Sequence, residues 1–142
     1  MKKTLEFLVY SNIYLSIGAS IVALATIILM GYEIVWSLLF IPFSATLLIY
    51  NFNRLTDSHE DIINIPERAN FIRKFGWKML YFSVFLYAIS LLLAYQRNIY
   101  TLIIAVIPVV CASLYSYFRF KKFFIIKNIL VSISWGFSVL LV

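Results

Sequence analysis

Long apolar stretches alternate with short polar segments along the whole chain. Five stretches are nearly free of charged residues and approach or exceed the roughly 20 residues that a helix needs to cross a membrane. They cover residues 6–30, 34–53, 77–96, 98–118 and 123–142. A single segment in lipid must pair its backbone N–H and C=O groups within itself, so each stretch is predicted to be a helix. The pattern therefore predicts an all-α fold, a multi-pass membrane helical bundle of about five transmembrane helices in one membrane domain, residues 1–142.

The polar links between these stretches are of two kinds. Residues 31–33 and 97–98 are so short that the helices on either side are predicted to form tight hairpins. The link 54–76 is longer and lacks the Gly/Ser-rich composition of a flexible linker. We interpret it as the end of the second helix, a turn near Pro66 and a short basic helix over 67–76. An acidic residue in the first turn of that helix, Glu67, would be favoured by the helix dipole.

Several residues inside the predicted spans are interpreted as structural. Pro42 and Pro108 each remove a backbone hydrogen bond and are expected to adjust the shape of their helices. Ala19 and Ala23 form a pair of small residues four positions apart, which favours close helix packing. Cys111 is the only cysteine, so it forms no disulfide within the chain and is expected to pack as a small apolar residue.

Charge is scarce and unevenly distributed. Hydrophobic residues make up 63% of the chain and charged residues 13%, whereas a soluble domain carries about 25% charged residues. Eleven of the 12 Lys and Arg residues precede the first span or follow the second and fourth, and only Arg97 lies on the other side. The positive-inside rule predicts that the N-terminus and the link 54–76 are cytoplasmic in a protein of the cell membrane. The net charge of +6 then reflects topology and the lipid surface, with no nucleic-acid partner.

Four of the six acidic residues gather in residues 50–68, YNFNRLTDSHEDIINIPER, at the cytoplasmic end of the second span. Asn53, Asp57 and Asp61 are spaced i, i+4 and i+8, so on a helix they form a ladder about 12 Å long. Such carboxylates repel each other unless a cation lies between them. Oxygen ligands suit Mg²⁺, which binds through one or two carboxylates plus substrate phosphates. His59, without partner ligands, is expected to be a solvated loop residue.

Basic residues accompany this ladder on the predicted cytoplasmic side. They are Arg68, Arg73, Lys74 and Lys78 just downstream, and Arg119, Lys121 and Lys122 after the fourth span. Carboxylates for a metal beside cations for phosphate indicate a Mg²⁺–diphosphate site. The alternative is a charged loop that caps the helix, with Asp57 and Asp61 paired to neighbouring basic residues.

The string from Asn53 to Asp61, NRLTDSHED, resembles the first aspartate-rich motif, N-D-x-x-D-x-x-x-D, of the UbiA family of intramembrane prenyltransferases. Three of its four defining positions match. NRLTDxxED followed by NxPER is similar to the archaeal-type branch of that family. Tyr115-Ser-Tyr-Phe-Arg119 resembles the Y-x-x-x-K/R segment before the family's fifth helix, and Lys127-Asn128 and Trp135-Gly136 are also similar. The resemblance covers essentially the whole chain but only the N-terminal half of the family's length.

The resemblance implies transfer of an isoprenyl group from a prenyl diphosphate to a lipophilic acceptor, with the diphosphate held by Mg²⁺. On the matching positions, it implies metal ligands at Asn53, Asp57 and Asp61, with Asp57 and Asp61 as the catalytic pair. It also implies diphosphate contacts at Arg68, Arg119, Lys127 and Tyr115. The lipid bilayer is the expected environment.

Two departures from the family pattern change the expectation. Arg54 stands where the motif has its second residue, an aspartate, and no Asp or Glu follows Glu67, so a second aspartate-rich motif is missing. We therefore expect a truncated or split N-terminal half of such an enzyme, whose missing part a second chain could supply. The alternative is a non-catalytic membrane helical bundle that binds an isoprenoid or an anionic lipid. A fragment of a transporter would place charged residues inside the spans, and this pattern does not.

Overall fold

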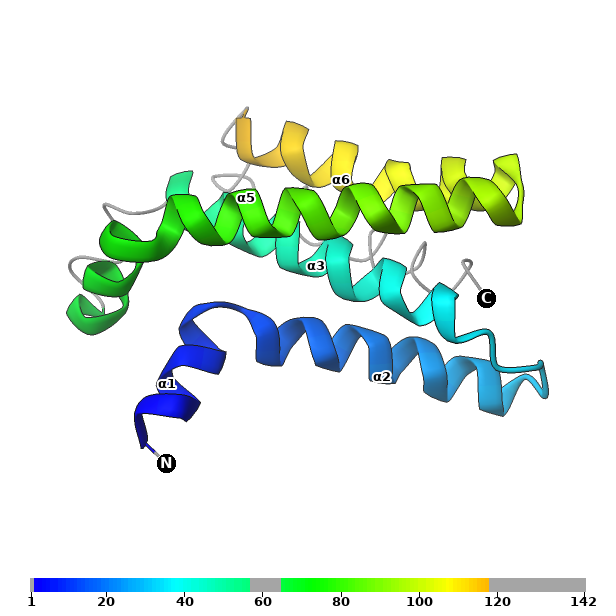
Figure 1. The fold of residues 1–142 in the computed structure, drawn as a ribbon, viewed down its shortest axis with the longest axis horizontal. Helices are drawn as coiled ribbons and strands as arrows, with labels where there is room; N and C mark the ends of the chain where they lie inside the picture. The colour runs from blue at the N-terminus through cyan, green and yellow to red at the C-terminus, as the bar shows by residue number, and fades with distance from the viewer. Residues whose placement is uncertain (1, 57–64, 118–142) are drawn as a thin grey trace.

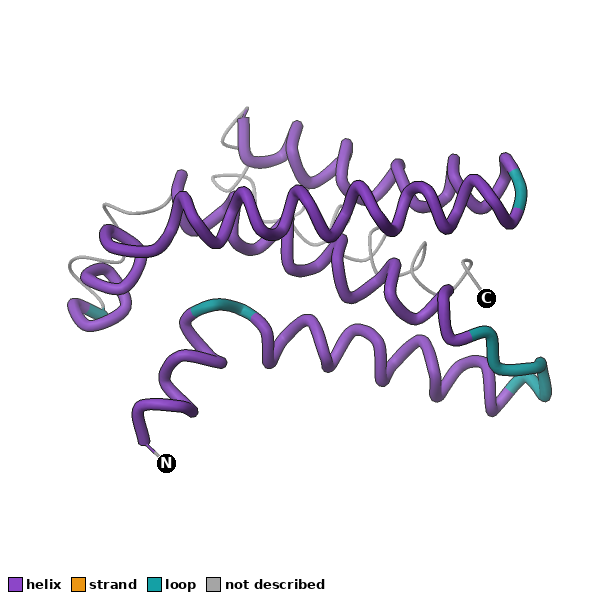
Figure 2. Tube along the Cα trace, in the orientation of Figure 1, coloured by secondary structure: helices purple, strands orange, loops and turns teal. Residues whose placement is uncertain are grey.

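The structure, a computed structural model, describes residues 2–56 and 65–117. These two ranges contain helices and no strands, which confirms the all-α prediction. The helices are α1 Lys2–Tyr10, α2 Ile13–Leu29, α3 Trp36–Thr56, α5 Pro66–Arg97 and α6 Ile99–Tyr117. Helices α2, α3, α5 and α6 run back and forth along one long direction (Figure 1), and Figure 2 shows the short non-helical segments between them.

Membrane-spanning character is clearest in α3 and α5. Both are long and apolar enough to cross a membrane, and α1 with α2 gives a third span if that bent pair is counted as one. Helix α6 is apolar over Ile99–Leu114, which is shorter. Large apolar side chains are exposed on the outside of the bundle, including Ile21 and Phe85, as expected where helices face lipid. The predicted span 123–142 lies outside the described residues.

The first predicted span, 6–30, is not one straight helix. It divides into α1 and α2, whose axes differ by 69° at a break over Ser11 and Asn12. Asn12 adopts a left-handed conformation with φ 63°, which asparagine tolerates better than most residues. Ser11 and Asn12 are both buried. The sequence pattern does not predict the break, because the partner of the Asn12 side chain, Asn51, lies in α3.

The predicted short helix over 67–76 is not separate from the third span. The two form one 32-residue helix, α5, about 48 Å long at 1.5 Å per residue. Because the hydrocarbon core is about 30 Å thick, the N-terminal part of α5 extends beyond it. Pro66 starts the helix, where its missing N–H costs nothing, and Glu67 lies in the first turn as predicted. Figure 1 shows this part of α5 curving toward α1.

Helix α3 is the centre of the bundle, since it contacts α2, α5 and α6. On one side Ile41 packs with Ala94 of α5 and Ala105 of α6. On another side Leu39 packs with the α2 residues Ala23 and Ile27. Ala19 and Ala23 are both almost completely buried, which confirms their predicted role in close helix packing.

Hydroxyl groups of neighbouring helices reach backbone carbonyls in α3 and α6. Ser20 Oγ of α2 donates to the Leu39 carbonyl at 2.8 Å. Tyr87 Oη of α5 donates to the Ala105 carbonyl at 3.1 Å. Each accepting residue lies three positions before a proline inside its own helix. A proline removes the helical hydrogen bond to the carbonyl four positions earlier, and each hydroxyl binds the next carbonyl along from an adjacent helix.

Gly76 allows α5 to approach the last turns of α3. A Cβ atom at this position would lie 2.9 Å from Leu55 Cδ2 and 3.2 Å from Ile72 Cγ2. The first distance is shorter than van der Waals contact, so a larger residue would require the Leu55 side chain or the α5 backbone to shift. Gly18 in α2 differs, because a Cβ atom there would meet nothing within 4 Å.

We therefore expect opposite effects from the same substitution at these two glycines. Gly18→Ala should raise the free energy of unfolding by about 0.5 kcal/mol, because it reduces the freedom of the unfolded chain. Gly76→Ala should lower it by about 1 kcal/mol through overpacking against Leu55. Thermal unfolding of the detergent-solubilised protein, followed by tryptophan fluorescence, compares the two. Equal stabilisation by both variants would contradict the close approach at Gly76.

Candidate active site

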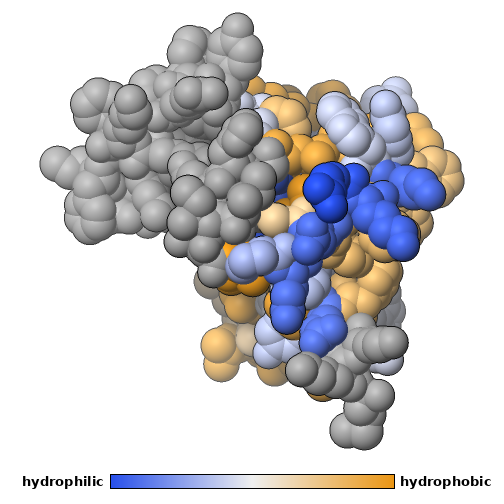
Figure 3. All heavy atoms as spheres, turned by 90° about the vertical axis from the view of Figure 1, so that its left-hand side faces the viewer, coloured by the Kyte–Doolittle hydropathy of each residue, from blue (hydrophilic) through white to orange (hydrophobic). Residues whose placement is uncertain are grey.

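One end of the bundle gathers the charged ends of several helices. Helix α3 ends there and α5 begins there, and the last turn of α6 lies at the same end (Figure 1). Figure 3 views this end and shows hydrophilic residues concentrated on it. Arg54 in the last turn of α3 and Glu67 and Arg68 in the first turn of α5 belong to it. We call this region the polar end of the bundle.

Asn53, the first residue of the aspartate-rich motif, lies in the last turn of α3 and is half-buried. Thr56 Oγ1 donates to the Asn53 carbonyl at 2.8 Å, which satisfies one of the carbonyls that a helix end leaves without a helical donor. The C-terminal end of a helix carries partial negative charge. The helix dipole at Asn53 therefore contributes attraction for a cation.

The other two predicted metal ligands, Asp57 and Asp61, lie outside the described residues. Within residues 2–56 and 65–117, no three His, Cys, Asp or Glu side chains come together as a metal site would require. Asn53 is thus the one residue of the ladder whose position the described ranges include.

Two of the four predicted diphosphate-contact residues lie within the described ranges, and two lie outside them. Arg68 is half-buried at the start of α5, at the polar end. Tyr115 belongs to the last turn of α6, so its backbone lies at this end too, although its side chain is not described. Arg119 and Lys127 lie outside the described residues. The structure therefore brings the positions of Asn53, Arg68 and Tyr115 to one end of the bundle.

A chain of buried hydrogen bonds, which the sequence analysis did not predict, holds this end of α3. Asn12 Nδ2 donates to Asn51 Oδ1 at 2.9 Å, and Asn51 Nδ2 donates to Ser83 Oγ at 2.9 Å. Ser83 Oγ in turn donates to the Met79 carbonyl at 2.7 Å. Asn12, Asn51 and Ser83 are all buried. Both ends of the Asn51 amide are therefore paired, one with the break before α2 and the other with α5.

The Asn12–Asn51–Ser83 chain of hydrogen bonds holds the orientation of Asn53, the first residue of the motif. Asn51 precedes Asn53 by two residues on the same helix, so fixing the rotation of α3 at Asn51 also fixes the direction of Asn53. A buried amide without partners costs several kcal/mol in an apolar medium, which disfavours any sliding of α3 that breaks these bonds. A pair of asparagines and a serine far apart in sequence carries no periodic signal, so only the folded chain reveals this contact.

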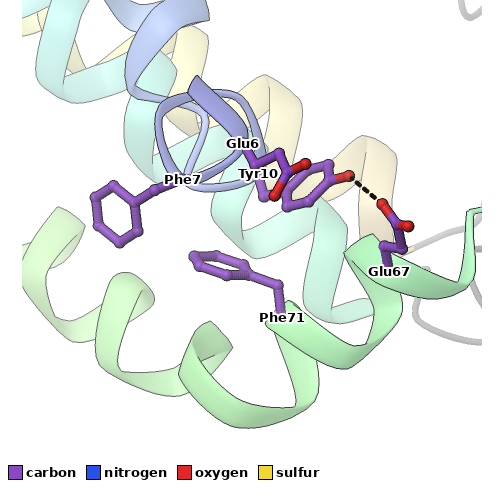
Figure 4. Close-up of a pocket in the computed structure, with 5 residues that line it drawn as sticks. All are labelled: Glu6, Phe7, Tyr10, Glu67 and Phe71. Atoms are coloured by element: carbon purple, nitrogen blue, oxygen red, sulfur yellow. Dashed lines mark hydrogen bonds between the residues drawn. The ribbon is translucent and has the colours of Figure 1, made fainter. Parts of the chain in front are cut away.

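A pocket of about 360 Å³ lies at the polar end between α1 and α5. It is lined by Glu6, Phe7, Tyr10, Glu67 and Phe71, shown in Figure 4. Tyr10 Oη donates to Glu67 Oε2 at 3.3 Å. The ring of Phe71 lies 5.8 Å from that of Phe7, edge to face, and 5.9 Å from that of Tyr10, measured between centroids.

The electrostatics of this pocket come from its carboxylates. Both charged side chains of the lining, Glu6 and Glu67, are acidic, and Glu67 accepts the hydrogen bond from Tyr10. The sequence placed Glu67 in a first turn but did not predict the pocket, because α1 reaches α5 only through the bend at Asn12.

The sequence was compared with those of known protein families. The sequence model of the UbiA prenyltransferase family matches residues 15–142, which is most of the chain. The chain belongs to the UbiA prenyltransferase family. No curated protein and no solved structure matches it.

UbiA membership assigns prenyl transfer to the chain at the level of the family, and it agrees with an all-helical membrane bundle. The matched region contains almost all of α2 and the whole of α3, α5 and α6. It begins after Asn12, so α1 and the three α1 residues of the pocket precede it. The UbiA match therefore covers the polar end around Asn53 and Arg68 but only two of the five residues that line the pocket.

Replacing Asn51 tests whether the buried chain stabilises the bundle. Asn51→Leu keeps the branching of the side chain but leaves the Asn12 amide and the Ser83 hydroxyl without this partner, so we expect the free energy of unfolding to fall by about 2–3 kcal/mol. Ser44→Ala is the matched control. Ser44 is equally buried in α3, but its hydroxyl donates only to Ile41 of its own helix, at 3.1 Å.

The control should cost less than about 1 kcal/mol. Unfolding in mixed micelles of increasing SDS content measures both variants. A double-mutant cycle of Asn51→Leu with Ser83→Ala should be less than additive, because the two side chains share one bond. Additive costs, or an Asn51→Leu as mild as the control, would contradict this role of the buried chain.

Proposed function

We propose that this protein transfers an isoprenyl group from a prenyl diphosphate to a lipophilic acceptor within the membrane. The observation that supports it most directly is the place of Asn53. The motif begins where α3 leaves the apolar bundle and enters the polar end. A prenyl diphosphate has a charged head and an apolar tail, so it needs a site at this kind of boundary. We further propose, from the strings NRLTDxxED and NxPER, that the protein belongs to the archaeal-type branch.

We propose Mg²⁺ as the cofactor, with Asn53, Asp57 and Asp61 as its protein ligands. The donor set fits, because all three side chains offer oxygen, which magnesium prefers. The negative end of the α3 dipole, next to Asn53, adds to the attraction for a cation. When bound, Mg²⁺ would neutralise charge on the leaving diphosphate. Asp57 and Asp61 would act by holding the diphosphate in place through the metal.

The remaining residues of the proposed site bind the substrate and exclude water. Arg68, at the start of α5, would bind the diphosphate directly, and we propose the same for Arg119, Lys127 and Tyr115. Arginine suits this role because its planar donors match phosphate oxygens. The apolar walls of the bundle would keep water away from the allylic carbon once the C–O bond weakens.

A second candidate function is binding of the diphosphate without efficient transfer. Arg54 replaces one carboxylate of the motif, and the sequence contains no Asp or Glu after Glu67. The 142 residues thus offer acidic ligands for about one metal ion, whereas the departing diphosphate develops about three negative charges that preorganised cations must stabilise. A second acidic motif would have to come from residues outside these 142, either in a continuous chain or in a second one.

Calorimetry with a non-reactive prenyl diphosphate analogue tests the site. We expect binding to the purified chain that requires Mg²⁺, and that Asp57→Asn and Asp61→Asn each weaken at least about tenfold, since each removes a charged ligand. Glu60→Gln removes a neighbouring carboxylate outside the i, i+4 ladder and should change affinity less than about twofold. Binding that persists in both aspartate variants would refute the metal site.

The same preparations distinguish the two candidate functions. Membranes containing the chain are incubated with labelled geranylgeranyl diphosphate, Mg²⁺ and a panel of lipid and aromatic acceptors. Prenylated product from this chain alone supports the transferase. Binding without product, converted to transfer by co-expressing a chain with a second aspartate-rich motif, supports the second candidate. Absence of Mg²⁺-dependent binding refutes both.

We propose that the polar end faces the cytoplasm, because eleven of the 12 basic residues lie on that side of the predicted spans. Single cysteines at Ser58 and Glu33, in a Cys111→Ala background, should show opposite accessibility to a membrane-impermeant thiol reagent in intact cells. Glu33 is chosen over Asn98 because the Asn98 side chain accepts a hydrogen bond from the Thr101 backbone N–H at 2.7 Å. Labelling of both positions from outside would contradict the orientation.

A further inference from the structure

The pocket between α1 and α5 has no role in the proposed transfer. Its volume is about 360 Å³, and five residues line it: Glu6, Phe7 and Tyr10 of α1, and Glu67 and Phe71 of α5. The three α1 residues precede residue 15, where the family match begins. Three of the five lining side chains therefore lie outside the matched residues.

The chemistry of the lining is specific. Three aromatic rings and two carboxylates meet in it, and none of the lining residues is basic. Figure 4 shows Phe7 and Phe71 on one side of the opening and the Tyr10–Glu67 hydrogen bond on the other. Arg68 follows Glu67 but does not line the pocket. The charged side chains that a ligand would meet in the lining, Glu6 and Glu67, are therefore both acidic.

This combination selects among the possible ligands. A bare metal ion would use the carboxylate oxygens but would leave the aromatic rings of the lining without a partner. A purely apolar ligand would remove water from the carboxylates without compensating them. An alkylammonium group satisfies both parts, because its methyl or methylene groups pack on aromatic faces by cation–π attraction while its charge faces the carboxylates.

We propose that this pocket binds an alkylammonium group of the choline or ethanolamine type. Its place at the polar end suits the head group of a membrane phospholipid. The neighbouring α1 side chains Leu5 and Val9 are more than half exposed, so an acyl chain would have apolar surface to lie against. A free amine offers the same ammonium chemistry. Either ligand would join α1 to α5, two helices that the bend at Asn12 brings together.

The binding test uses choline and its neutral isostere 3,3-dimethylbutan-1-ol. The full chain is purified in a maltoside detergent, because phosphocholine detergents would occupy the pocket. Saturation-transfer NMR titrations should give binding of choline at least about fivefold tighter than that of the isostere, which is about 1 kcal/mol of cation–π and ionic attraction. Equal affinity for both compounds would overturn the proposal.

Variants with matched controls locate the binding. Glu67→Gln removes the charge but keeps an acceptor for Tyr10, and Phe71→Leu keeps apolar volume but removes the ring. Each should weaken choline binding at least about fivefold. The controls are Glu33→Gln and Phe85→Leu, which make the same changes in the link after α2 and on the exposed face of α5. Unchanged affinity in Glu67→Gln, a surface substitution that leaves the packing intact, would overturn the proposal even if Phe71→Leu failed to fold.

Lipid retention distinguishes a phospholipid head group from a free amine as the source of the ammonium group. Native mass spectrometry of the chain released from nanodiscs should show retained phosphatidylcholine or phosphatidylethanolamine, with less phosphatidylglycerol, and the preference should disappear in Glu67→Gln. Choline binding without any lipid preference identifies a free amine as the ligand and still supports the pocket. Retention of phosphatidylglycerol alone would contradict it. None of these results depends on Mg²⁺ or prenyl diphosphate, so they leave the transferase proposal untouched.

Discussion

An amide group buried among apolar helices has to find hydrogen-bond partners inside the protein, because lipid provides none. Asn51 meets this constraint by bonding Asn12 on one side and Ser83 on the other. Three helical segments are thereby held in one relative position. These bonds hold the bend before α2. They also hold the rotation of α3 and the position of α5 along its own axis. Apolar contacts are less selective, since a helix that slides by one turn exchanges one set of them for another.

The consequences appear at the polar end of the bundle. Because Asn51 is fixed, Asn53 leaves the apolar core at a defined angle, and the aspartate-rich motif starts from there. Gly76 lets α5 pass close to Leu55, so Arg68 is carried to the same end. The left-handed conformation of Asn12 directs α1 away from α2 and toward the start of α5. One buried hydrogen-bonded chain thus supports both the candidate active site and the pocket beside it.

The two sites differ in the charge that they attract. Asn53, Asp57, Asp61 and the neighbouring arginines suit a metal ion and an anionic diphosphate. Glu6 and Glu67, surrounded by aromatic rings, suit an organic cation. Such a neighbour would keep lipid head groups of the ammonium type close to the proposed diphosphate site. Family membership extends to the first site, whereas the second also depends on α1, which lies before the matched residues.

Sequence and tertiary structure determined different properties of this protein. The long uncharged stretches determined the helices and the membrane bundle, because the cost of unpaired backbone groups in lipid leaves a single span no other regular structure. The spacing of Asn53, Asp57 and Asp61 indicated the family and the chemistry of the motif, because both depend only on residue type and on the local repeat of a helix. The break at Asn12, the continuity of α5 through Gly76 and the pocket around Phe71 were decided by tertiary structure alone. Each depends on contacts between residues tens of positions apart, and a local pattern carries no record of which side chains meet.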